Sequence, residues 1–175
     1  MSVVKTLAEI ALWRRGPRDL AVSGPVLVAV MGLYALQSTV QLAIATHHDV
    51  AILDGIVELA VDCAILAALL AVGGRAHRLP QTLLAVLGTE VLLAPLTIAL
   101  ISGVVATTDG DILGIALRLA QIAVVVWNLL IVAHILRAAF DVSLAVGVLL
   151  SIGFAVLSYV LNDLFWGPQM RAAGA

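Results

Sequence analysis

The chain alternates long apolar runs with short polar breaks. Five runs stand out, at residues 24–45, 50–72, 82–105, 112–136 and 142–161. An α-helix of about 20 residues crosses a hydrocarbon core of ~30 Å, because each residue advances the helix by about 1.5 Å. Short breaks make consecutive helices antiparallel neighbours. The pattern therefore predicts an all-α fold, a polytopic membrane helical bundle of five transmembrane helices that forms a single membrane domain over residues 1–175.

A shorter pattern precedes the first run. Val3, Leu7 and Ile10 recur at helical spacing with polar residues between them, and Trp13 follows. A helix with one apolar face lies in the plane of the membrane interface, and tryptophan is enriched at that depth. We therefore predict a short amphipathic interfacial helix over residues 3–15.

Composition supports the membrane class. The chain is 63% apolar and only 11% charged, whereas soluble domains carry about 25% charged residues. A soluble core of this length leaves too much apolar surface in water, but lipid-facing helices do not. The single cysteine, Cys63, excludes an internal disulfide and a CxxC motif.

The charges are distributed unevenly between the two predicted sides of the membrane. One side carries Lys5, Arg14, Arg15, Arg18, Arg75, Arg78 and Arg137, and the other carries Arg171 with Asp49, Asp109, Asp111 and Asp163. Cytoplasmic loops are enriched in lysine and arginine. The pattern predicts a bacterial-type inner (plasma) membrane protein with a cytoplasmic N-terminus and an outer C-terminus.

The second run contains a ladder of acids, Asp54, Glu58 and Asp62, which four-residue spacing places on one helix face. Glu90 and Arg118 fall at comparable depths in later runs. A charge at the helix centre costs at least ~2.5–3.5 kcal/mol, so we expect these groups to face the bundle. We expect Arg118 to pair with Glu58, or alternatively with Asp54 or Asp62.

One arginine cannot neutralise four acids, so the remaining carboxyl groups must be protonated, hydrated or bound to a cation. The functional interpretation is an ion or proton path. The alternative is a structural polar network that fixes helix register.

Further polar side chains extend the pattern along the first and fourth runs. They are Tyr34, Gln37, Gln41, Gln121 and Asn128. They either line a polar interior or form interhelical hydrogen bonds worth ~0.6–2 kcal/mol each. Pro95 interrupts the third run beside Glu90, which indicates either a plain kink or the broken helix of a binding site.

Small residues mark a candidate packing surface on the fifth run. They are Ser143, Gly147, Ser151 and Ala155, spaced every four residues. Such a ridge lets another helix approach closely. We expect a homo-oligomer or a subunit of a larger membrane complex.

Metal and cofactor signals are weak. His47, His48 and Asp49 resemble part of a metal site, but adjacent histidines do not share a helix face, so a polar turn is favoured. His134 has no second histidine at matching depth for haem. We predict no cofactor.

Motifs of catalytic sites are absent from the sequence. The few basic residues fit the lipid bilayer, through anionic headgroups, rather than nucleic acid.

Residues 19–25, Asp-Leu-Ala-Val-Ser-Gly-Pro, resemble the Asp-Leu-x-Gly-Pro segment of the Yip1-type five-span membrane protein family, with two additional residues. The five spans and the N-terminal segment are also similar to that family. The resemblance implies a small multipass protein of membrane organisation or trafficking that works through partners.

Three functions follow from these patterns. The first is a noncatalytic assembly or membrane-organisation subunit that acts through helix packing. The second is a proton- or cation-translocating element that uses the carboxylate ladder. The third is an integral membrane enzyme or a lipid- or quinone-binding protein, and we favour a nonenzymatic role.

Overall fold

The computed structural model describes residues 2–46, 52–108 and 111–173. Its α-helices are α1 (Val3–Ala11), α2 (Gly24–Thr46), α3 (Ile52–Val72), α4 (Leu79–Val105), α5 (Ile112–Phe140) and α6 (Leu144–Ala173). Two short 3-10 helices, η1 (Pro17–Asp19) and η2 (Ala76–Arg78), lie in connections. The described residues contain no strand.

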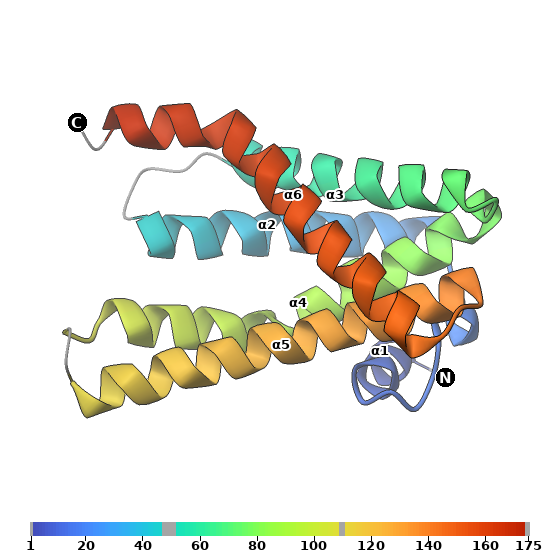
Figure 1. Cartoon of the computed structure of the whole chain (residues 1–175), viewed down its shortest axis with the longest axis horizontal. Helices are drawn as coiled ribbons and strands as arrows, with labels where there is room; N and C mark the ends of the chain where they lie inside the picture. Colours follow the sequence, from blue (N-terminus) through green and yellow to red (C-terminus); the bar gives the residue numbers. More distant parts are fainter. Residues whose placement is uncertain (1, 47–51, 109–110, 174–175) are drawn as a thin grey trace.

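The five long helices run alternately in opposite directions, and α6 crosses the bundle obliquely (Figure 1). Each is long and apolar enough to cross a membrane. The predicted all-α bundle with five such helices is therefore confirmed.

Three boundaries of the long helices differ from the prediction by more than two residues. One is the end of α5, which lies at Phe140 rather than at residue 136. The third long helix, α4, begins at Leu79 rather than at residue 82, because Pro80 fits its first turn, where the missing N–H is not needed. The last helix, α6, continues beyond residue 161 to Ala173.

The two ends of the bundle differ in charge. The N-terminal segment, the α3–α4 connection and the α5–α6 connection lie at one end (Figure 1). We call it the basic end, because these segments carry Lys5, Arg14, Arg15, Arg18, Arg75, Arg78 and Arg137. The opposite end, where α3 and α5 begin, is called the far end.

The apolar core is concentrated in the half of the bundle toward the basic end. Its fully buried large side chains include Leu66, Leu70, Leu84, Leu87, Ile131, Ile135 and Leu136. All of them lie between the middle of their helix and the basic end. The far half is packed less densely, which leaves room for a cavity.

The N-terminal helix is shorter than predicted and packs on the bundle. It ends at Ala11, not at residue 15, and Ser2 caps its start by accepting a hydrogen bond from the Lys5 N–H at 3.3 Å. Leu7 is buried against α4, where a Cβ on Gly88 would lie 2.8 Å from its methyl carbons. Because only glycine leaves that space, Gly88 allows α1 to seat closely.

Asp141 ties the segments of the basic end together. Its carboxylate pairs with Arg18, with Arg75 at 3.2 Å and with Arg78 at 2.8 Å. The hydrogen bond from Arg78, followed by that from Arg18, holds the pKa of the Asp141 carboxyl below its usual range. We call Asp141 and these arginines the basic-end latch.

Candidate functional site

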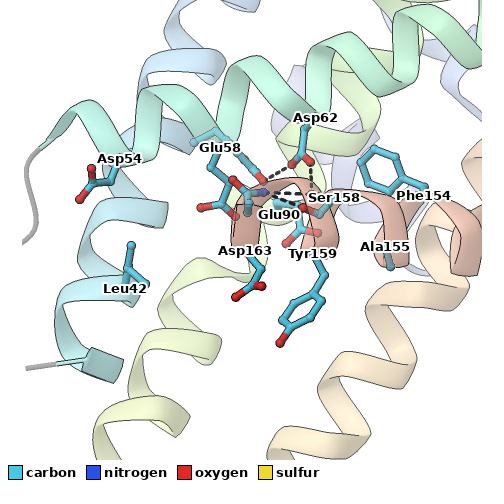
Figure 2. A pocket seen from close by; sticks show the side chains of 12 residues that line it. Leu42, Asp54, Glu58, Asp62, Glu90, Phe154, Ala155, Ser158, Tyr159 and Asp163 are labelled. Carbon is cyan, nitrogen blue, oxygen red and sulfur yellow. Dashed lines mark hydrogen bonds between the residues drawn. The ribbon is translucent and has the colours of Figure 1, made fainter. Parts of the chain in front are cut away.

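The carboxylate ladder of α3 faces a cavity between α2, α3, α4 and α6 (Figure 2). The cavity has a volume of about 580 Å³, within the range of small-ligand sites. Its described lining residues are Tyr34, Leu42, Asp54, Glu58, Asp62, Glu90, Phe154, Ala155, Ser158, Tyr159, Asn162 and Asp163. We call it the acidic cavity, because none of these residues is lysine, arginine or histidine.

Asp62 lies at the deep end of the acidic cavity and is only 5% exposed. The Tyr34 hydroxyl donates to its Oδ2 at 2.5 Å, and the Ser158 hydroxyl donates to its Oδ1 at 2.5 Å. These donors come from α2 and α6. The Asp62 carboxyl therefore joins three helices through neutral donors.

The two deep glutamates also bond to neutral donors from other helices. The Asn128 amide of α5 donates to Glu90 Oε1 at 2.5 Å. The buried Ser38 hydroxyl of α2 bonds to the Glu58 carboxyl, on which the charges of Asp62 and Glu90 also act. The carboxylates thus influence one another electrostatically.

The acidic cavity extends from the far end to the middle of the bundle. Asp54 occupies the first turn of α3, and Asp163 is exposed. Asp62 follows Ile52 by ten residues, which is ~15 Å of helix. One turn further, the fully buried Leu66 begins the apolar half of the bundle. The acidic side chains therefore reach the centre of the bundle from one side.

The structure places Arg118 differently from the expectation. It is exposed on α5 and does not line the acidic cavity. The charged groups that act on Glu58 are Asp62 and Glu90. The expected pairing of Arg118 with Glu58, or alternatively with Asp54 or Asp62, stays a prediction.

The side chains predicted to line one polar interior lie at several different sites in the structure. Tyr34 lines the acidic cavity, and Asn128 reaches it through Glu90. Gln41 instead donates to the Thr97 hydroxyl at 3.1 Å. Gln37 lines a separate apolar groove between α2 and α4.

Gln121 is half-buried on α5, outside the lining of the acidic cavity. Pro95 does not end α4, which continues to Val105, and it lines the groove that holds Gln37.

The small-residue ridge of α6 packs within the chain. A Cβ on Gly147 would lie 2.5 Å from the Ala133 carbonyl oxygen, and the Ser151 hydroxyl donates to the Leu129 carbonyl at 2.7 Å. Both partners belong to α5. Ser143 is exposed and Ala155 lines the acidic cavity, so Gly147 and Ser151 are the two members of the predicted ridge with these α5 contacts.

Sequence reasoning missed the contribution of α6 to the site. Ser158, Asn162 and Asp163 line the acidic cavity. The predicted span ended at residue 161, which placed Asp163 in a tail. The four-residue spacing of Ser158 and Asn162, a polar stripe on an apolar helix, was the available signal.

Of the weak metal and haem candidates, His134 lies among the described residues. His47, His48 and Asp49 lie outside the described residues. In the part of the chain that is described, no three His, Cys, Asp or Glu side chains are arranged to hold a metal ion. The Nε2 atom of His134 lies 2.8 Å from the Arg15 carbonyl oxygen and so anchors the N-terminal segment to α5.

Among the described residues, five helices are long and apolar enough to span a bilayer, as in a multipass membrane protein. Five of the chain's acidic residues line one cavity among four of these helices. Comparisons with known protein families, with curated proteins and with solved structures found no match, so the likeness to the Yip1-type family stays a prediction.

Proposed function

We propose that the chain takes up protons, or another small cation, into the acidic cavity from the far end of the bundle. The observation that carries this proposal is the gathering of five carboxyl side chains around one cavity without a described basic lining residue. Uncompensated carboxylates in a low-dielectric bundle are unfavourable. Protons or cations that enter the cavity relieve this cost.

A purely structural network accounts for the site less well. The deep acids do join helices, since Asp62 bonds to Tyr34 and Ser158. Amide or hydroxyl side chains make such links without the cost of a buried charge. A structural network also needs no cavity, and it does not explain Asp54 and Asp163 near the far end. Acids along a cleft with low-dielectric walls instead raise the local concentration of cations.

Protons fit the geometry better than a tightly coordinated metal ion. The described residues offer no group of three ligands for a metal. Asp54, Glu58 and Asp62 are separated by single helical turns, about 6 Å of rise each, and hydroxyl groups of Tyr34 and Ser158 adjoin the last of them. Carboxyl groups at this spacing, with water or hydroxyl groups between them, form a proton relay.

The acidic cavity ends at the middle of the bundle, where the buried apolar half begins. Passage across the whole membrane requires a second conformation in which the basic half opens, as in alternating access.

Proton flux in proteoliposomes tests the proposal. A pH gradient is imposed, and a pH-sensitive dye inside the vesicles reports entry. We expect Asp62→Asn to lower the flux by about tenfold or more, because it removes the deepest proton acceptor. Glu58→Gln should lower the proton flux as well, because this substitution interrupts the relay.

The matched control is Asp19→Asn. Asp19 accepts a hydrogen bond from the Gly16 N–H at 3.1 Å at the basic end, and asparagine retains an acceptor oxygen. This variant should conduct like the wild type. Equal flux in wild type and Asp62→Asn contradicts the proposal.

A further inference from the structure

The turn that ends α1 carries an unusual residue. Trp13 has φ 60°, a left-handed backbone that it shares only with Asp141 among the described non-glycine residues. Its N–H bonds to the Ile10 carbonyl at 2.9 Å, and the Arg14 N–H bonds to the Glu9 carbonyl at 2.8 Å. This is the helix-ending pattern in which glycine normally occupies the left-handed position. Because a bulky side chain is strained there, helix termination alone does not account for the tryptophan.

The Trp13 side chain forms one wall of an apolar groove. Trp13 is 48% exposed and lines, with Leu12, a groove of about 320 Å³. The opposite wall consists of Val126, Trp127 and their neighbours on α5. The left-handed turn thus places a tryptophan across from a second tryptophan.

Positive charge adjoins this groove. Arg14, next to Trp13, is exposed and makes no ion pair within the described part of the chain, and Lys5 on α1 is exposed as well. The nearby Glu9 is already paired with Arg15 at 2.7 Å. A ligand with an apolar body and a negative group therefore complements the site.

We propose that the groove between α1 and α5 binds an acyl chain of an anionic phospholipid, whose phosphate pairs with Arg14. Tryptophan side chains favour the boundary between headgroups and acyl chains. The strain at Trp13 is then the consequence of placing an aromatic wall at this boundary. The site is independent of the acidic cavity, which lies between α2, α3, α4 and α6.

Native mass spectrometry of the purified chain tests this site, with retention of phosphatidylglycerol compared with phosphatidylcholine. One Lys or Arg near an anionic lipid contributes about 1 kcal/mol, so we expect about fivefold preferential retention of the anionic lipid. Trp13→Gly should lose retention while its thermal stability stays equal or rises, because glycine relieves the strained turn. Arg14→Gln should lose the preference for the anionic lipid.

The charge-matched control is Arg137→Gln, which removes one positive charge near the end of α5, outside the groove lining. It should retain the wild-type preference. The proposal is overturned if the wild type shows no preference for the anionic lipid or if Trp13→Gly retains the lipid as the wild type does. It is also overturned if Arg137→Gln weakens the preference as much as Arg14→Gln. Full displacement by glycerol phosphate also overturns it, since that competitor lacks an acyl chain.

Discussion

At the scale of single residues, Asp62 shows how a carboxyl group is kept inside the bundle. Its two oxygens each accept a hydroxyl hydrogen bond, from Tyr34 and from Ser158. Hydrogen bonds to charged groups are worth ~1.5–3 kcal/mol net, and a buried acceptor that loses its donor is costly. The donors therefore contribute to stability and also hold the carboxyl at the deep end of the acidic cavity.

Tyr34→Phe tests this role. The substitution removes one donor and leaves the ring, so we expect a loss of about 1–2 kcal/mol in the free energy of unfolding. Thermal unfolding of the detergent-solubilised protein measures it. Tyr159→Phe is the control, because Tyr159 lines the same cavity with an exposed ring. Equal effects of the two variants speak against a special role for the Tyr34 hydroxyl.

At the scale of elements, α2 and α3 meet through a glycine beside the acid ladder. A Cβ on Gly55 would lie 2.0 Å from the Ala35 carbonyl oxygen and 2.4 Å from Thr39 Oγ1. The backbones can approach only because that position lacks a side chain. The close contact sets the position of Asp54, which precedes Gly55 on the chain, and of Glu58, which follows it by three residues.

Gly55→Ala should therefore separate α2 from α3. We expect a loss of about 1–3 kcal/mol in the free energy of unfolding, since the added methyl overlaps backbone atoms. Gly32→Ala is the matched control, because a Cβ there meets nothing within 4 Å. Thermal unfolding distinguishes them, and a Gly55→Ala protein as stable as Gly32→Ala contradicts this packing.

The basic-end latch predicts a pH dependence. The Arg78 hydrogen bond, and then Arg18, lower the pKa of Asp141 in the folded chain. A group whose folded pKa is depressed stabilises the fold above its unfolded pKa, about 3.9 for aspartate, and loses that contribution as the pH falls through the folded value. Asp141→Asn removes the charge but tolerates the left-handed backbone at φ 60°.

The melting temperatures of wild type and Asp141→Asn should therefore differ at neutral pH and converge in strong acid, below the usual range of aspartate. A constant difference across the whole pH range indicates that the ionised carboxylate is not the stabilising form.

At the scale of the whole molecule, the bundle is divided into a packed half and an acidic half. Fully buried leucine and isoleucine side chains fill the half toward the basic end, whereas carboxyl groups line a cavity toward the far end. The packed half blocks a continuous aqueous path in this conformation. This division is the basis of the proposal that uptake occurs from one side.

Much of this architecture follows from the sequence. Apolar runs of membrane-spanning length predict the five helices, and four-residue spacing predicts that Asp54, Glu58 and Asp62 share a face. Both predictions depend only on the regular rise and turn of an α-helix. Glu90 could also be placed at the correct depth, because depth depends only on position along a span.

The rotation of each helix about its axis, and which helices lie next to one another, could not be predicted in the same way. Arg118 was expected at the depth of Glu58 but is exposed and does not line the acidic cavity, because the packing between helices sets the rotation of each helix about its axis. The oblique path of α6, which brings Ser158 and Asp163 to the cavity, also depends on contacts with α5 that are distant in sequence. The early end of α1 arises from a left-handed tryptophan, which the usual glycine signal does not reveal.

The most direct test is infrared spectroscopy of the carboxyl C=O bands in the reconstituted protein during a pH titration. If the acidic cavity takes up protons as proposed, wild type should show bands of protonated carboxyl groups that appear and disappear reversibly. In the triple variant Glu58→Gln, Asp62→Asn and Glu90→Gln these bands should be lost. A triple variant with the same pH-dependent carboxyl bands as wild type contradicts the account, because protons would then bind elsewhere.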